Sequence, residues 1–316
     1  MNQPLFLKPI FQERIWGGTA LRDQFDYNIP SDHTGECWAI SAHPNGPSVV
    51  EDGPFSGKTV AELWEERRDL FGGMKGEVFP LLTKILDAST DLSVQVHPND
   101  EYARINENGE LGKTECWYII DCKQGAEMIY GHTAQSKKEF ADKVEKGEWT
   151  SLLRRVPIQP GDFFFVPSGT VHALCEGTLV LETQQSSDTT YRVYDYDRID
   201  AEGNKRELHI EKSIDVSTIP HVDAPVESIS REMNGVRITH FVDSSFFSVE
   251  KWEVSGTADF QQNKPFMLFS VIDGEGVLKK EGKHSPIKRG AHFILPNGFD
   301  EFSLEGQLTL IASWKE

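Results

Sequence analysis

The chain has 316 residues, of which 38% are hydrophobic and 26% are charged, a composition typical of a folded protein of about two domains. Lys and Arg number 32 against 50 Asp and Glu, which gives a formal net charge of −18. This balance argues against nucleic acid as the main partner, because no excess of cations is available to neutralise phosphates. An anionic small molecule remains compatible with it, since a pocket needs only one or two local cations.

The sequence also indicates where the protein works. No stretch approaches the ~20 apolar residues of a membrane span, and the first residues lack the basic start and apolar run of a signal peptide. The cysteines form no CxxC pair, so we interpret Cys37, Cys116, Cys122 and Cys175 as reduced thiols. We therefore expect a cytoplasmic protein with neither a membrane nor a nucleic-acid partner.

Most of the chain up to residue 215 has the pattern of short strands. Runs rich in Val, Ile, Phe, Trp and Tyr alternate with Gly, Pro, Asn and Asp, which is typical of a β-sandwich or barrel. The predicted strands are 36–42, 80–86, 92–97, 115–121, 127–130, 162–166, 178–183 and 191–194.

Two segments between these strands predict helices, 59–71 and 136–153. Thr59 and Glu62 have the spacing of a capping box, and Ser136 and Glu139 repeat it. The second segment stands between two groups of strands, so we expect a helical insertion in the first domain.

A domain boundary is expected near 215–235, where residues 217–225 are polar and include two prolines. The strand pattern then resumes without helices, over 236–242, 246–254, 266–272, 276–280, 292–295, 301–304 and 308–313. Segments 161–169 and 290–298 share one pattern: Gly, one residue, an apolar run, Pro, one residue, Gly. We predict a mainly β protein with domains over 1–220 and 221–316, in which only the first copy of this hairpin continues into a histidine.

Three segments of the first domain carry residues that suit a metal. In the strand 91–97, Gln95 and His97 point away from the apolar face. Glu115 follows in the next strand, and His172 comes directly after the hairpin of 161–169. Two histidines and one carboxylate suit zinc or another first-row divalent metal, and Gln95 could add a neutral oxygen ligand.

Each of these signals is weak when it is taken alone. A single histidine on a strand is usually a surface residue or a hydrogen-bonded core residue. Lys113 and Glu115 share one face two residues apart, so they could also form an ordinary surface ion pair. The prediction rests on the joint occurrence of His97, Glu115 and His172 with the hairpin.

These motifs resemble those of a known family. The segment 161–172 resembles the second sequence motif of the cupin superfamily, in which a small β-barrel holds a metal through histidines and a glutamate. More specifically, the chain resembles the short bacterial form of the type I mannose-6-phosphate isomerases, also called phosphomannose isomerases. The motifs that carry this resemblance are WGG at 16–18, ECW at 36–38, AHP at 42–44, QVHP at 95–98, KTE at 113–115, PSGTVHA at 167–173 and ETQQSSDTTYRVYDYDR at 182–198.

The resemblance implies two cupin-like β-barrel or jelly-roll domains, with one Zn²⁺ per chain in the first and a vestigial second. His97, Glu115, His172 and Gln95 would hold the metal, although Gln95 could contact the substrate instead. Arg192 would be a catalytic residue and Lys113 would bind the substrate.

The implied reaction is the isomerisation of D-mannose 6-phosphate and D-fructose 6-phosphate through an enediolate, with a small sugar phosphate as the partner. Neither the general base nor the oligomeric state follows from the sequence. Two alternatives stay open: an iron-dependent cupin oxygenase, and a non-catalytic regulatory protein that binds a sugar phosphate. Against the oxygenase, the first motif region has a single histidine and no His-x-His pair.

Overall fold

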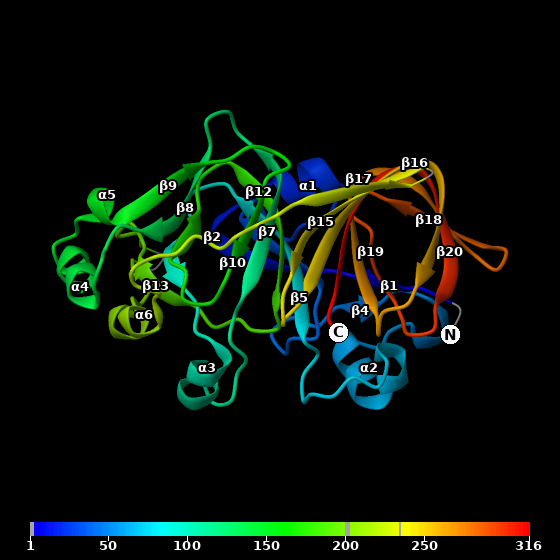
Figure 1. Ribbon diagram of the computed structural model, residues 1–316, viewed down its shortest axis with the longest axis horizontal. Helices are drawn as coiled ribbons and strands as arrows, with labels where there is room; N and C mark the ends of the chain where they lie inside the picture. Colours follow the sequence, from blue (N-terminus) through cyan, green and yellow to red (C-terminus); the bar gives the residue numbers. More distant parts are fainter. Residues whose placement is uncertain (1–2, 200–202, 234) are drawn as a thin grey trace.

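The computed structural model describes residues 3–199, 203–233 and 235–316. Its strands form three antiparallel sheets, which lie side by side along the long axis of the molecule (Figure 1). The five-stranded sheet lies at one end, the six-stranded sheet is central and the nine-stranded sheet is at the other end. The predicted mainly β fold class is therefore confirmed.

Two sheets are built from residues 10–194. The six-stranded sheet has the order β10 (Phe163–Val166), β7 (Glu115–Cys122), β12 (Thr178–Gln185), β5 (Leu81–Ala88), β3 (Thr34–Ile40) and β2 (Ile10–Gly18). The five-stranded sheet has the order β13 (Tyr191–Tyr194), β6 (Val94–Val96), β11 (His172–Leu174), β8 (Glu127–His132) and β9 (Leu153–Pro157).

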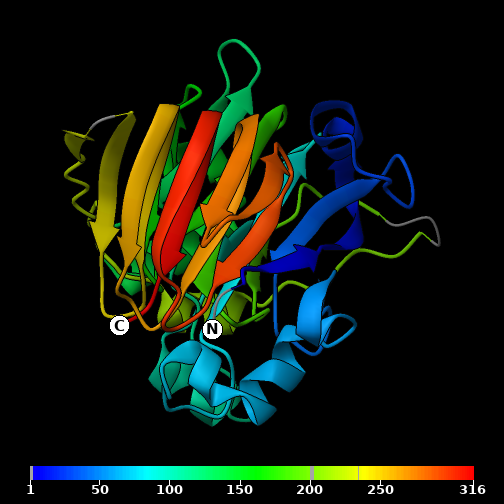
Figure 2. The same cartoon turned by 90° about the vertical axis from the view of Figure 1, so that its right-hand side faces the viewer.

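The nine-stranded sheet combines the two ends of the chain. Its order is β14 (Ile229–Met233), β15 (Val236–Asp243), β16 (Ser248–Gln262), β20 (Asp300–Trp314), β17 (Met267–Lys280), β19 (His292–Leu295), β1 (Leu5–Lys8) and β4 (Val49–Val50), with β18 (Lys283–Lys288) paired to β17. Figure 2 shows its long strands from the side of the second half of the chain. Because β1 joins it by pairing Leu5 with Ile294, the chain's two halves share a sheet. The division of the chain at residue 220 stays a prediction.

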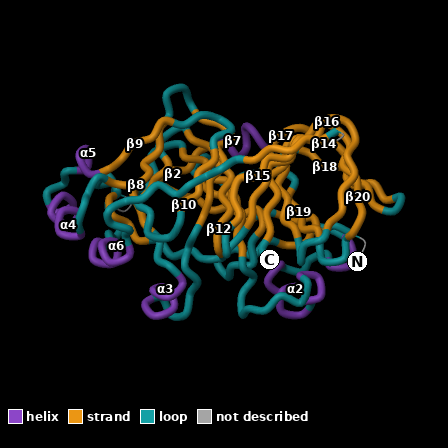
Figure 3. The backbone as a smooth tube through the Cα atoms, in the orientation of Figure 1, coloured by secondary structure: helices purple, strands orange, loops and turns teal. Residues whose placement is uncertain are grey.

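Most helices lie at one end of the molecule or along one side, as Figure 3 shows, whereas α1 lies on the opposite side (Figure 1). They are α1 (Ala20–Phe25), η1 (Gly53–Phe55), α2 (Val60–Glu66), η2 (Arg68–Phe71), α3 (Asp100–Asn106), α4 (Lys137–Glu145), α5 (Trp149–Leu152) and α6 (Ile210–Val216). Thr59 and Glu62 form a reciprocal capping box at the start of α2. At α4, the Ser136 side chain accepts from the Glu139 backbone N–H. None of the described helices is long and apolar enough to cross a membrane.

Glycines inside the nine-stranded sheet explain where the sequence prediction of its strands was wrong. The predicted strands 266–272 and 276–280 are one strand, β17, and 301–304 and 308–313 are one strand, β20. Gly274 has a φ of 79°, and a Cβ there would lie 1.9 Å from the Gln307 carbonyl oxygen. Gly276 pairs with Gly306 in the neighbouring strand. These glycines therefore permit bends and close backbone approach within continuous strands, where the sequence pattern suggested turns.

The two copies of the repeated sequence pattern have the same local structure. β10 follows Gly161 and β19 follows Gly290, each strand beginning two residues after its glycine. The closing glycines, Gly169 and Gly298, have φ values of 87° and 69°, so both copies end in the same left-handed turn. The first copy then leads into β11 with His172, and the second leads to the buried Phe299.

The six-stranded sheet has two different faces. One face packs against the nine-stranded sheet through a core that includes Cys37, Ile85 and Cys116. The opposite face is turned towards the five-stranded sheet, where Trp117 and Met128 belong to a second core. Polar residues of this second layer form the candidate site.

Candidate metal centre and active site

His97, Glu115 and His172 converge between the two sheets. Their ligand atoms all lie within 4.8 Å of one another. Glu115 Oε1 is 3.1 Å from His172 Nε2, and Glu115 Oε2 is 3.5 Å from His97 Nε2. Glu115 begins β7, His172 begins β11 and His97 directly follows β6, so rigid strand ends hold all three.

The hydrogen bonds of the two histidines fix which ring nitrogen is free. His97 Nδ1 lies 2.9 Å from the Thr189 carbonyl oxygen, and His172 Nδ1 lies 2.8 Å from that of Thr170. Because a carbonyl oxygen only accepts, each ring carries a proton on Nδ1, and Nε2 is the nitrogen that can present a lone pair to a metal. Burial, with Lys113 nearby, keeps the pKa of His97 well below its usual value, so that ring is neutral at pH 7.

This arrangement fits a divalent cation. His97 Nε2, His172 Nε2 and Glu115 Oε1 are buried and have no hydrogen-bond partner in the described structure. Lone pairs that face one another in a dry site repel, and a cation between them removes this repulsion. Two neutral imidazoles and one carboxylate are the donor set that zinc and similar metals prefer.

Strand register places Gln95 and Arg192 beside this cluster. Gln95 lies directly opposite His172 across β6 and β11, and Arg192 lies directly opposite Gln95 across β6 and β13. Residues that face each other across an antiparallel pair project from the same side of the sheet. Gln95 and Arg192 also line one cavity of about 310 Å³.

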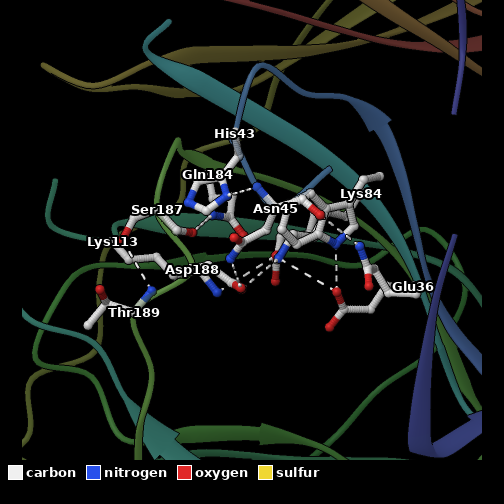
Figure 4. Close-up of polar contacts among 12 residues, drawn as sticks. Glu36, His43, Asn45, Lys84, Lys113, Gln184, Ser187, Asp188 and Thr189 are labelled. Atoms are coloured by element: carbon white, nitrogen blue, oxygen red, sulfur yellow. Dashed lines mark hydrogen bonds and ion pairs between the residues drawn. The ribbon is translucent and has the colours of Figure 1, made fainter. Parts of the chain in front are cut away.

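Sequence reasoning missed several charged residues of this cavity, because their roles depend on pairing between distant strands. Lys84 on β5 lies 3.9–4.0 Å from Glu36 on β3, Glu182 on β12 and Asp188. Figure 4 shows Lys84 beside Glu36, and Asp188 contacts both Lys84 and Asn45. The strand pairing explains this placement, since Lys84 is directly opposite Glu182.

The buried carboxylates are oriented by tryptophans. The Trp38 indole N–H donates to Glu36 Oε2 at 2.6 Å, and the Trp117 indole N–H donates to Glu182 Oε2 at 2.8 Å. Glu182 Oε1 is left buried with no hydrogen-bond partner in the described structure. One oxygen of Glu182 is therefore fixed and the other is free to accept or release a proton.

Burial and neighbouring charges shift the pKa values of the two central glutamates in opposite directions. Burial by itself would raise the pKa of Glu115, but Lys113, 2.9 Å from its Oε2, and the two histidines hold this pKa well below the usual value. Burial and the charge of Glu115 raise the pKa of Glu182, which Lys113 and Lys84 only partly offset. Carboxylates with separated pKa values suit separate roles, a permanent anion and a proton carrier.

A larger cavity of about 1490 Å³ lies in the nine-stranded part of the structure, lined by residues such as Arg231, Glu250 and Lys280. The cluster of His97, Glu115 and His172, which could hold a metal ion, lies elsewhere, and Glu115 contacts Lys113 in the wall of the smaller cavity. Chemistry rather than size therefore identifies the candidate site.

His292 is a buried histidine of the second half and has two partners. Its Nε2 lies 2.7 Å from the Tyr27 hydroxyl and its Nδ1 lies 2.9 Å from Ser270 Oγ. Burial lowers the pKa of His292 from 6.5 to about 3. It therefore connects β19 to the first part of the chain as a neutral group.

We expect His292→Gln to keep the catalytic rate within about twofold and to change acid stability. Between pH 6.5 and 3, the folded protein binds fewer protons at His292 than the unfolded chain does. The free energy of unfolding therefore decreases as the pH falls through this window. The contribution of His292 to the slope of the unfolding free energy against pH approaches about 1.4 kcal/mol per pH unit, and this contribution disappears when glutamine replaces the histidine. Thermal unfolding at several pH values measures this slope.

His284→Gln serves as the control, because His284 is exposed on β18. Its unfolding free energy should depend on pH between 6.5 and 3 as that of the unchanged protein does. A hundredfold loss of rate in a folded His292→Gln protein would contradict a purely structural role.

Comparisons with known proteins show the family of the chain. The family model of the phosphomannose isomerase type I catalytic domain matches residues 5–153, and that of the mannose-6-phosphate isomerase cupin domain matches residues 237–315. A mannose-6-phosphate isomerase of Bacillus subtilis is 58% identical over 99% of both chains, and that of Streptococcus mutans is 52% identical over 99% of this chain and 98% of its own.

Solved structures show the same relationship. A crystal structure of the mannose 6-phosphate isomerase from Bacillus subtilis matches with a TM-score of 0.98 and 58% identity, over 99% of this chain and 100% of that one. Phosphomannose isomerase variants from Salmonella typhimurium, 15% identical with a TM-score of 0.81, show that the fold is shared. Fold and site thus define an enzyme of the cupin class. The chain belongs to the type I phosphomannose isomerase family.

Proposed function

We propose that this protein is a zinc-dependent isomerase that interconverts D-mannose 6-phosphate and D-fructose 6-phosphate through an enediolate. The observation that carries the metal is the buried convergence of His97 Nε2, His172 Nε2 and Glu115 without hydrogen-bonding partners for the two nitrogens. The activity is supported by the mannose-6-phosphate isomerases that are 52–58% identical over nearly the whole chain. The small-molecule partner is accordingly a sugar phosphate, and we propose a cytoplasmic location.

Each ligand residue has a structural reason for its role. His97, His172 and Glu115 would hold the Zn²⁺, and Gln95 stands next to His172 as an additional oxygen ligand or as a contact to the substrate. A bound divalent metal supplies a Lewis acid that stabilises negative charge on the sugar oxygens. The ion pair with Lys113 keeps Glu115 anionic, as a metal ligand requires.

Glu182 is the residue that we propose as the proton carrier. Isomerisation of the aldose needs a base that takes the proton from C2 and returns it to C1. Glu182 Oε1 is buried, has no hydrogen-bond partner in the described structure and belongs to a carboxyl group with a raised pKa. Lys84 and Lys113, each 3.9 Å from Glu182 Oε1, can bind the substrate hydroxyls beside it.

The proposal is tested by elemental analysis of the purified protein, coupled to an isomerase assay on mannose 6-phosphate. We expect one zinc per chain, loss of activity on chelation and recovery when zinc returns. Iron with oxygen consumption would support an oxygenase instead, and binding of mannose 6-phosphate without turnover would support a regulatory protein.

Arg192→Ala should lower the catalytic efficiency on mannose 6-phosphate by tenfold to a hundredfold. The Arg192 guanidinium lines the cavity, and charge-assisted hydrogen bonds of about 1.5–3 kcal/mol correspond to one or two factors of ten. Steady-state kinetics separates two roles: KM rises if Arg192 binds the phosphate, and kcat falls if it stabilises the enediolate. Zinc content should not change, so a variant that loses its metal would assign Arg192 to the support of the metal ligands.

A further inference from the structure

One loop supplies the hydrogen-bond acceptor that orients His97, a proposed metal ligand. The loop covers residues 186–190, between β12 and β13, and its Thr189 carbonyl oxygen lies 2.9 Å from His97 Nδ1. On the other side of the ring, His97 Nε2 faces Glu115 Oε2 at 3.5 Å. The proton of the neutral ring can therefore sit on Nδ1, towards Thr189, or on Nε2, towards Glu115. Only the first tautomer leaves Nε2 free for a metal.

The side chain of Gln184 holds this loop from the end of β12. Gln184 is fully buried, and its Nε2 donates to two backbone carbonyl oxygens, that of Gln185 at 2.7 Å and that of Ser187 at 2.6 Å (Figure 4). Ser187 is also fully buried. Its N–H donates to the Gln185 carbonyl oxygen at 2.8 Å, and its Oγ accepts from the Thr189 N–H at 3.3 Å. Gln184 thus reaches Thr189 through one fixed residue, Ser187.

The orientation of the Gln184 amide leaves one of its atoms unsatisfied. Two carbonyl oxygens on one side of the amide require the NH₂ group there, so Oε1 points the other way. Gln184 Oε1 is buried and has no hydrogen-bond partner in the described structure. An unpaired buried acceptor destabilises a fold, and an apolar side chain of the same length would avoid this cost. The polar side chain is therefore explained by what its N–H groups do, which is to fix the loop.

The neighbouring residue, Gln185, fixes where the loop begins. Its Oε1 accepts from the Thr114 N–H at 2.9 Å, and its own N–H donates to the Thr114 carbonyl oxygen at 3.1 Å. Thr114 directly precedes Glu115, and Gln184 is paired with Glu115 across β12 and β7. The loop that orients one proposed ligand is therefore anchored to the strand that carries another.

We propose that Gln184 is a positioning residue for His97. By holding Ser187, it keeps the Thr189 carbonyl oxygen in place and so fixes the His97 tautomer that can bind a metal. This inference rests on the proposed function, because it concerns the ligand set proposed there. Removing a group that orients a histidine ligand typically lowers metal affinity by about tenfold to a hundredfold.

Gln262 offers a matched control in the nine-stranded sheet. It is also buried, and its Nε2 also donates to two backbone carbonyl oxygens, those of Leu295 at 3.3 Å and Pro296 at 3.1 Å. It differs in that its Oε1 is satisfied, by the Lys264 N–H at 2.8 Å. The candidate metal-binding cluster is built at the ends of β6, β7 and β11, in the other two sheets.

The test compares Gln184→Met with Gln262→Met, which remove the same kind of paired N–H donors. Gln184→Met should raise the zinc dissociation constant about tenfold to a hundredfold, whereas Gln262→Met should leave it within twofold. Thermal unfolding should show the opposite order. Gln262→Met deprives the Lys264 N–H of its acceptor, whereas Gln184→Met removes an unpaired acceptor, so the control should have the lower melting temperature. Competition with a chromophoric chelator measures the zinc constant.

The metal-free protein gives a second test that needs neither zinc nor turnover. The nitrogen chemical shifts of His97 distinguish its two tautomers, and a His97→Gln protein assigns them. We expect Nδ1–H in the unchanged protein and in Gln262→Met, and a large share of Nε2–H in Gln184→Met. Ser187→Ala removes only the hydroxyl that accepts from the Thr189 N–H. It should shift the tautomer in the same direction by a smaller amount, and it decides the question if Gln184→Met does not fold.

Two results would overturn the proposal. One is a set of unchanged His97 nitrogen shifts in both Gln184→Met and Ser187→Ala. The other is an equal rise of the zinc dissociation constant in Gln184→Met and Gln262→Met, since the loss would then follow stability. A protein that binds no zinc or does not isomerise mannose 6-phosphate would refute the proposed function, and the tautomer comparison in the metal-free protein would still decide the role of Gln184.

Discussion

His172→Ala should yield a protein that binds no metal tightly and has no measurable isomerase turnover. His172 is fully buried, and its Nε2 lies 3.1 Å from Glu115 Oε1. Its loss leaves one imidazole and one carboxylate as strong ligands, and metal affinity falls steeply when a ligand is removed. Elemental analysis and the mannose 6-phosphate assay on the same preparation measure both effects.

His132→Ala is a suitable control, because His132 is also buried and its ring also donates a single hydrogen bond to a backbone carbonyl oxygen, that of Thr218. It lies on β8, next to β11, and is not part of the metal-binding cluster. The control should lose stability while its zinc content stays at one per chain. Full turnover in a metal-free His172→Ala protein would refute the metal's role.

Glu182→Gln should lower kcat at least a hundredfold and leave the zinc content unchanged. Glutamine keeps the size of the side chain and an oxygen for the Trp117 indole, but it cannot take up a proton at pH 7. Positioned acid–base groups contribute roughly 10²–10⁴-fold to rates. The raised pKa of Glu182 also predicts that activity falls with decreasing pH at values above those of an ordinary glutamate, as the base becomes protonated. The pH–rate profile of the variant should lack this acidic limb.

The second half offers a matched control. Glu250 is buried and, like Glu182, accepts from an indole N–H, that of Trp252 at 2.8 Å, but its Oε1 is paired with Arg231 and it lies away from the candidate metal-binding cluster. Glu250→Gln should keep the kcat within twofold. If Glu182→Gln lowers the rate no more than this control does, another group carries the proton.

The convergence of His97, Glu115 and His172 could be predicted because each residue stands in a short local motif. Glu115 begins β7 and His97 directly follows β6, so strand alternation predicts the face of each, and His172 follows a turn that Gly169 specifies. Lys84 and Glu182 sit in strands that look like ordinary core strands. Only the pairing of β5 with β12 brings Lys84 and Glu182 opposite each other, next to the candidate site.

The strands were predictable for the same reason, and their partners were not. Alternation and turn residues are local properties of the sequence. Nothing in the segment 5–8 indicates that it pairs with β19 near the other end of the chain. The glycines of β17 and β20 were misinterpreted as turns because a bend and a turn need the same residue type.

The pairing of β1 with β19 has a consequence for how the protein is made. Leu5 pairs with Ile294, so the first strand waits for almost the whole chain to leave the ribosome. At roughly 5–20 residues per second, this wait lasts about 15–60 s. During that time β1 lacks its neighbour β19, and the side chains of Leu5 and Leu7, which are buried in the folded protein, stay exposed to solvent. A chain that terminates before β19 would leave its N-terminal strand as an unpaired edge, open to association with other chains or to proteolysis.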